Sequence, residues 1–135
     1  MSKDMNGPIF DEKGYDRETF APFCLQNCLN TEWNDVRLIF NDWAWIARIY
    51  STNSIDSYYL NGYGVQGLVQ AAMIAGAIHV PEDRVHFNSE GDTFYIHFRD
   101  LDVAIRAARA ASSMIKHVEQ IKRMIEIARA HGLED

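Results

Sequence analysis

The feature of this sequence that most constrains its fold is one stretch of alternating side chains, residues 85–99. Apolar and polar residues alternate along it with a period of two, which is typical of a half-buried strand. The alternation is interrupted at Gly91-Asp92, a dipeptide that favours a two-residue type II′ turn with the glycine at positive φ. The stretch therefore predicts an antiparallel hairpin whose register pairs Phe87 with Ile96.

Other periodicities predict strands in the first third of the chain and helices after them. Asp42 is at an N-cap position, and Gly132 is at the position that follows a helix C-cap. A single helix over residues 101–131 would be about 46 Å long, but a globule of this size has a radius of gyration of only about 14 Å. We therefore expect two C-terminal helices or one bent helix, with the break near Ser112-Ser113. The other expected elements are strands at 20–29 and 36–40 and helices at 43–50 and 65–78.

Hairpins followed by helices indicate an α+β fold rather than alternating βαβ units. We expect antiparallel hairpins that form a small sheet packed against helices. The chain has 135 residues, the usual size of one domain, so residues 19–135 are predicted to form a single domain. Residues 1–18 are polar and contain Gly7, Pro8 and Gly14, and we expect a loosely ordered arm there.

The charge and cysteine content restrict the partners and the compartment. The formal net charge is −6, and an acidic surface repels the phosphates of nucleic acids and membranes while attracting a basic partner. The N-terminus lacks the apolar segment of a secretory signal. Cys24 and Cys28 are too few for a disulfide framework, and we interpret them as semi-buried thiols on a strand. These features predict a cytoplasmic protein that binds neither nucleic acid nor membrane.

Two patterns resemble parts of ligand-binding sites, but neither site is complete. The segment Gly62 to Gly67 matches the Gly-x-Gly-x-x-Gly pattern of dinucleotide-binding turns, but no further βα units follow it, so we interpret it as a tightly packed helix start. His86 and His97 face each other across the predicted hairpin. Zinc requires three or four ligands, so we predict a solvated polar face and no metal or other cofactor. A small metal-binding or enzymatic domain using this pair remains the alternative.

Aromatic and acidic residues are concentrated in one part of the chain. Three tryptophans and four tyrosines fall within residues 33–63, with aspartates among them. Exposed tryptophan and tyrosine often dominate the binding energy of protein interfaces, and neighbouring acids suit a basic partner. We predict that the partner-binding residues are Asp42, Trp43, Trp45, Asp56, Tyr58, Tyr59, Glu90 and Asp92.

Two short motifs resemble those of the immunity protein 51 family of bacterial polymorphic toxin systems. Asn61-Gly62-Tyr63 is similar to its Gly-Asn-Gly-Tyr helix start, and Ser89-Glu90 is similar to its Ser-Glu at a hairpin turn. The resemblance covers about residues 57–131. The chain departs from the family pattern after each motif, with Gly64-Val65 in place of Asp or Ser and then Trp, and Gly91-Asp92 in place of Ala-Gly. These motif residues are expected to serve the helix start and the turn.

The resemblance implies an antidote that binds and occludes a cognate toxin domain, and such a protein has no catalytic residues of its own. Together with the acidity and the aromatic cluster, it predicts an immunity protein that neutralises a nuclease or another enzyme with a basic active-site surface. It is therefore not expected to be an enzyme. A regulatory or scaffold subunit with a different protein partner is the remaining alternative. The sequence leaves open whether the protein is a monomer or a homodimer.

Overall fold

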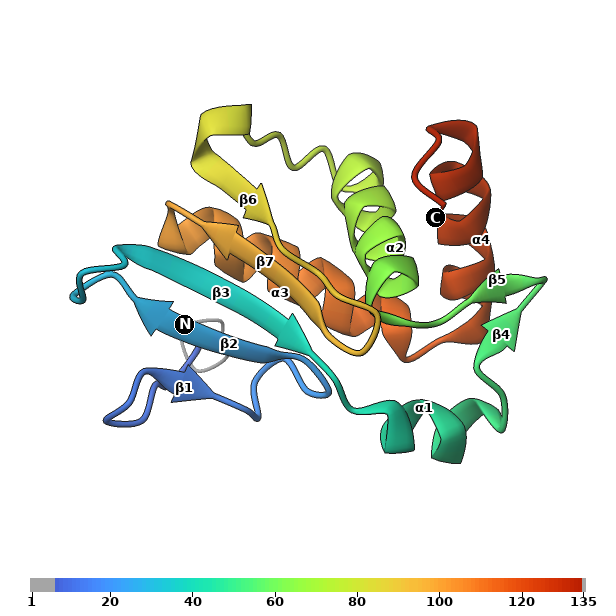
Figure 1. Ribbon diagram of the computed structural model, residues 1–135, viewed down its shortest axis with the longest axis horizontal. Coiled ribbons are helices and arrows are strands. Elements are labelled where there is room, and N and C mark those ends of the chain that lie inside the picture. The colour runs from blue at the N-terminus through green and yellow to red at the C-terminus, as the bar shows by residue number, and fades with distance from the viewer. Residues whose placement is uncertain (1–6, 135) are drawn as a thin grey trace.

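The computed structural model describes residues 7–134 and shows an α+β fold. One antiparallel sheet has the strand order β1-β2-β3-β7-β6, and helices cover one of its faces (Figure 1). Helices α2 (Gly62–Ala75) and α3 (Leu101–Ile115) pack directly on the sheet, and α4 (Val118–Ala130) packs on both of these helices. The prediction of a small antiparallel sheet packed against helices, with two helices at the C-terminal end, is confirmed.

The five-stranded sheet joins two hairpins that are far apart in the sequence. The first part consists of β1 (Tyr15–Asp16), β2 (Cys24–Cys28) and β3 (Asp35–Phe40), and the second of β6 (Val85–Phe87) and β7 (Phe94–Phe98). The two parts meet where β3 pairs with β7, with Val36 opposite Phe98 and Phe40 opposite Phe94. A second, two-stranded sheet consists of β4 (Ser54–Ile55) and β5 (Tyr58–Tyr59).

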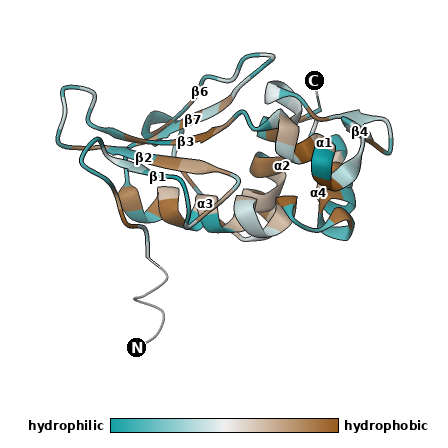
Figure 2. Cartoon of the chain, turned by 90° about the horizontal axis from the view of Figure 1, so that it is seen from below, coloured by the Kyte–Doolittle hydropathy of each residue, from teal (hydrophilic) through white to brown (hydrophobic). Residues whose placement is uncertain are grey.

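The main core lies between the sheet and the helices, which form two layers (Figure 2). Leu38 on β3 and Ile96 on β7 are fully buried, as are four alanines of α3 (Leu101–Ile115). Alanine has a small side chain, so α3 lies close against the larger side chains of the strands. Burying each large apolar side chain contributes about 1.5–3 kcal/mol to folding. The buried alanines of α3 are Ala104, Ala107, Ala108 and Ala111.

The helices follow the predictions with shifts at their ends. Helix α1 (Trp43–Tyr50) begins after Asp42, whose side chain accepts a hydrogen bond from the Trp45 N–H as predicted. Helix α2 (Gly62–Ala75) begins three residues earlier than expected, because the Asn61 side chain caps it by accepting from the Gly64 N–H at 2.8 Å.

The break between the C-terminal helices is at Lys116-His117 and not at Ser112-Ser113. Ser112 is buried inside α3, where its hydroxyl donates to the Ala21 carbonyl at 3.1 Å, so the serine continues the helix instead of ending it. Helix α4 (Val118–Ala130) has its C-cap at His131 and is followed by Gly132 with φ 69°, as predicted.

The hairpin β6–β7 has the predicted register, with Phe87 opposite Ile96 and His86 opposite His97. The predicted turn type is wrong, because Gly91 does not have positive φ. Its carbonyl instead accepts a hydrogen bond from the Gly62 N–H at 3.0 Å, which ties the turn to the first residue of α2. The Gly-Asp dipeptide by itself favours a type II′ turn, but it does not reveal this contact with a distant segment.

Residues 1–18 are predicted to form a loosely ordered arm, but part of this segment forms a strand. Residues 1–6 lie outside the described residues, but Tyr15 and Asp16 form strand β1, paired with Gln26 and Leu25. Asp16 is buried. Its carboxylate accepts hydrogen bonds from the backbone N–H groups of Ile9, Glu18 and Thr19. The prediction therefore misses a strand that pairs with β2, and the Asp16 carboxylate joins the segments on either side of it. No helix in residues 7–134 is long and apolar enough to cross a membrane.

Candidate functional site

A groove of about 650 Å³ lies between α1, the β5–α2 connection and the hairpin turn. Three segments of the chain supply its walls, and the last of them, the hairpin turn, is distant in sequence from the other two. Most of the lining is apolar. Among the described residues that line it, Asp92 is the one that carries a charge. The lining residues are Trp43, Ile46, Ala47, Ser51, Thr52, Asn53, Tyr59, Leu60, Asn61, Gly91 and Asp92.

Trp43 holds the walls of this groove together. Its indole N–H donates to the Asp92 backbone carbonyl at 2.9 Å, across 49 residues of sequence. Its ring meets Phe40 edge-on, with centroids 5.0 Å apart. Asp92 is exposed, and its carboxylate accepts a hydrogen bond from the Thr93 hydroxyl at 3.4 Å. The groove therefore presents aromatic surface next to negative charge.

The second aromatic wall is Tyr59, which is 55% exposed. The neighbouring Tyr58 points the other way and is fully buried, with its hydroxyl donating to the Gly64 carbonyl at 2.6 Å. Successive residues of a strand point to opposite sides, so β5 places one tyrosine in the core and the other at the surface. The prediction that Tyr58 contacts a partner is wrong for this reason.

The structure brings three of the predicted partner-binding residues together in the groove, namely Trp43, Tyr59 and Asp92. Asp42 is exposed immediately before Trp43. Trp45 lies outside the groove and meets Tyr50 edge-on, at 6.1 Å between centroids, where it packs against the core. Trp45 therefore does not join the other aromatic residues that line the groove.

The remaining two predicted partner-binding residues, Asp56 and Glu90, are exposed but do not line the groove. The backbone of each makes a structural contact. The Asp56 carbonyl accepts from the Arg129 guanidinium at 2.9 Å. Glu90 pairs with Thr93 through backbone hydrogen bonds at the hairpin turn.

Of the motif residues, Asn61, Gly62 and Ser89 make contacts at the helix start and the hairpin turn. A Cβ atom at Gly62 would lie 1.7 Å from the Glu90 carbonyl oxygen, so only glycine fits where the turn meets α2. Asn61 caps the helix, and the Ser89 hydroxyl accepts from the Tyr95 N–H at 3.0 Å. Tyr63 is exposed on α2. The glycine pattern serves close packing, as predicted, because a Cβ atom would also lie 1.9 Å from the Tyr59 carbonyl oxygen at Gly64 and 2.5 Å from the Tyr58 hydroxyl at Gly67.

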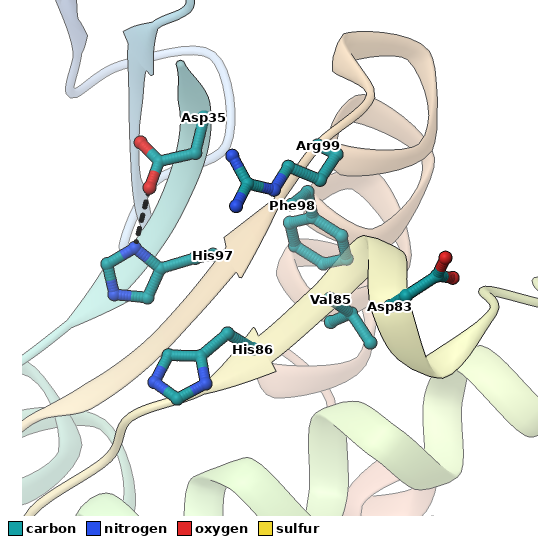
Figure 3. Close-up of a pocket in the computed structure, with 7 residues that line it drawn as sticks. All are labelled: Asp35, Asp83, Val85, His86, His97, Phe98 and Arg99. Atoms are coloured by element: carbon teal, nitrogen blue, oxygen red, sulfur yellow. Dashed lines mark hydrogen bonds and ion pairs between the residues drawn. The ribbon is translucent and has the colours of Figure 1, made fainter. Parts of the chain in front are cut away.

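A second polar cluster lies on the sheet beside a cavity of about 190 Å³ (Figure 3). His97 Nδ1 is 3.0 Å from an Asp35 carboxylate oxygen, and the His86 ring lies beside His97 with centroids 5.6 Å apart. Tyr95 stacks on His97 at 4.9 Å. Burial lowers the pKa of His97, although the Asp35 hydrogen bond acts in the opposite direction. The ring is therefore neutral near pH 7.

The sequence predicted the facing histidines, but it did not predict Asp35. Asp35 lies 62 residues from His97, and only the pairing of β3 with β7 brings them together. Arg37, one residue further along the same face of β3, pairs with the other Asp35 oxygen at 3.0 Å. Within residues 7–134, no three His, Cys, Asp or Glu side chains form a group suited to hold a metal ion.

The cysteines are unpaired thiols on β2, as predicted. Cys24 is half-buried and Cys28 is buried. Burial raises the pKa of both thiols, so they are protonated at neutral pH, where the thiol is a poor nucleophile and metal ligand.

No protein-family model, curated protein or solved structure matches this chain. The resemblance to the immunity protein 51 family therefore stays a prediction that rests on the motifs themselves.

Proposed function

We propose that this protein is an immunity protein that binds a cognate toxin domain and occludes a basic surface on it. The observation that carries the proposal is the convergence of Trp43, Tyr59 and Asp92 on one groove. Aromatic walls supply contact area at low entropic cost. An acid at their rim favours a partner that presents lysine or arginine.

Electrostatics supports the same kind of partner. The net charge of −6 attracts a basic protein over long range, and Asp42 and Asp92 add negative charge near the groove. Complementary charge mainly raises the association rate, while buried aromatic anchors mainly lower the dissociation rate. The proposal therefore assigns the first effect to the two aspartates and the second to Tyr59.

The first test is rescue. The chain is co-expressed with the toxin domain encoded by the adjacent gene, and cell growth is followed. Growth in the presence of the chain, and arrest in its absence, is the expected result. Continued arrest with abundant folded chain would contradict the immunity function.

The second test is binding of the purified toxin domain by an Asp42→Asn/Asp92→Lys variant. Asparagine keeps the N-cap of α1, so the variant raises the net charge by three units without removing the cap. We expect association at low salt to slow by about tenfold or more, and the difference to shrink in high salt. A Glu12→Gln/Glu82→Lys variant makes the same charge change at exposed positions outside the groove.

The anchor is tested separately with Tyr59→Ala. We expect faster dissociation, with an affinity loss of at least about 1 kcal/mol. Tyr63→Ala is the matched control, because Tyr63 is also exposed but does not line the groove. Equal effects of the two substitutions, or equal slowing by both charge variants, would remove the groove from the binding surface.

A further inference from the structure

We propose that His86 and His97 together bind one divalent transition-metal ion, with Asp35 orienting His97 as a ligand. The site lies on strands β3, β6 and β7, away from the groove, and it is independent of the proposed partner. The ion belongs to the class that imidazole binds well, such as Ni²⁺, Zn²⁺ or Cu²⁺.

The contact with Asp35 sets the tautomer of His97 that a metal ligand needs. An ionised carboxylate can only accept a hydrogen bond, so the Asp35 contact places the proton of a neutral ring on Nδ1. The lone pair is then on Nε2. A carboxylate that accepts from the far nitrogen of a histidine is the usual second partner of metal-binding histidines, because it fixes the ring and raises its basicity.

The second argument is that His97 Nε2 is a buried nitrogen with no hydrogen-bond partner among the described residues. Leaving a buried polar atom unpaired costs about 1–3 kcal/mol. A metal ion shared with His86 would satisfy this atom. Tyr95 stacks on one side of the His97 ring. Figure 3 shows the contact of this ring with Asp35 and the His86 ring beside it.

The third argument is the separation of the two imidazoles. A Zn–N bond of about 2.1 Å places a metal about 3.2 Å from the centre of a ligating ring. Two rings on one tetrahedral ion then stand roughly 5–6 Å apart, and the centroids of His86 and His97 are 5.6 Å apart. The cross-strand register sets this spacing, since the two residues are direct partners in the ladder.

The charges around the pair limit its affinity. Asp35 and Asp83 carry negative charge at the cavity, while Arg99 lines it and Arg37 pairs with Asp35. The Arg99 guanidinium is directed to the Asn34 carbonyl at 3.2 Å. With two protein ligands, water completes the coordination, and we expect one ion per chain with micromolar affinity.

The test titrates the full, untagged and chelator-treated chain with Ni²⁺, Zn²⁺ and Mg²⁺ by calorimetry at neutral pH. We expect one Ni²⁺ or Zn²⁺ per chain and no heat of binding with Mg²⁺, which prefers oxygen ligands. His86→Ala should weaken Ni²⁺ binding by at least about tenfold. His86 is exposed on an edge strand, so this variant keeps the core intact.

His79→Ala is the matched control, because His79 is an exposed histidine outside the cavity. Asp35→Asn should weaken binding by about 10- to 100-fold through the loss of the orienting carboxylate. In nuclear magnetic resonance spectra, paramagnetic Ni²⁺ should broaden the ring signals of His86 and His97 before those of the other three histidines. Equal broadening of all five, or equal affinity of the His86→Ala and His79→Ala variants, would overturn the proposal.

Discussion

The indole N–H of Trp43 donates to the backbone carbonyl of Asp92 at 2.9 Å. This one hydrogen bond joins the first residue of α1 to the turn between β6 and β7. The same turn accepts the Gly62 N–H through Gly91. The hairpin turn is therefore held from two sides, by α1 and by the start of α2, and this double attachment shapes the groove.

Trp43→Phe keeps an aromatic ring but removes the donor to Asp92. We expect a loss of about 1–2 kcal/mol in the free energy of unfolding, because a carbonyl loses its partner and contact area is lost. The measurement is urea unfolding, with amide exchange of Gly62 as a local readout, since its N–H donates to the same turn. Trp33→Phe is the control, because Trp33 is 58% exposed. Equal destabilisation by both variants would contradict the bridging role of Trp43.

Gly62→Ala tests how tightly the turn and α2 approach each other. The added Cβ would lie 1.7 Å from the Glu90 carbonyl oxygen, and backbone atoms must move to admit it. We expect a loss of about 3 kcal/mol or more in thermal or urea unfolding, at the upper end for an overpacked site. Gly91→Ala adds the same methyl group with nothing within 4 Å, so its effect should stay within about 0.5 kcal/mol. A mild effect at Gly62 would show that the contact is looser than described.

Asp16→Asn tests the carboxylate that joins the segments on either side of β1. Burial alone would raise the pKa of Asp16, but hydrogen bonds from Thr19, Glu18 and Ile9 outweigh it, and the pKa is lowered. A lowered pKa in the folded state contributes stability above the unfolded value of about 3.9, and this contribution is lost as the pH falls through the folded value.

We therefore expect the Asp16→Asn variant to be about 2 kcal/mol less stable than the wild type at pH 7. The difference should shrink as unfolding is measured at pH 4 and then near pH 2. Glu12→Gln is the control, because Glu12 is exposed on the same segment. A constant difference at all three pH values would show that the carboxylate charge does not stabilise β1.

The secondary-structure predictions were most successful where a single short-range rule is sufficient. The period of two and the two-residue turn were sufficient for the register of β6 and β7, and Asp42 and Gly132 marked the ends of α1 and α4 correctly. These features depend on residues only a few positions apart, so tertiary contacts do not need to be known.

The errors occurred where a distant segment overrides the local preference. The type II′ turn was wrong because Gly62, about 30 residues earlier, binds the turn carbonyl. Ser112 was expected to break a helix, but its hydroxyl bonds to Ala21 instead. Strand β1 was missed because it is only two residues long and pairs with Gln26 and Leu25, which belong to another segment.

The sequence by itself determined the α+β class, the approximate positions of the helices, and the pairing of His86 with His97, because these depend on periodicity and short-range geometry. Only the tertiary structure decided that β3 pairs with β7, that Asp35 binds His97 and that Trp43, Tyr59 and Asp92 meet at one groove. Which tyrosine of β5 is buried was likewise settled by packing. The physical reason is that strand pairing between distant segments follows from the total area buried, a quantity that no local stretch of sequence contains.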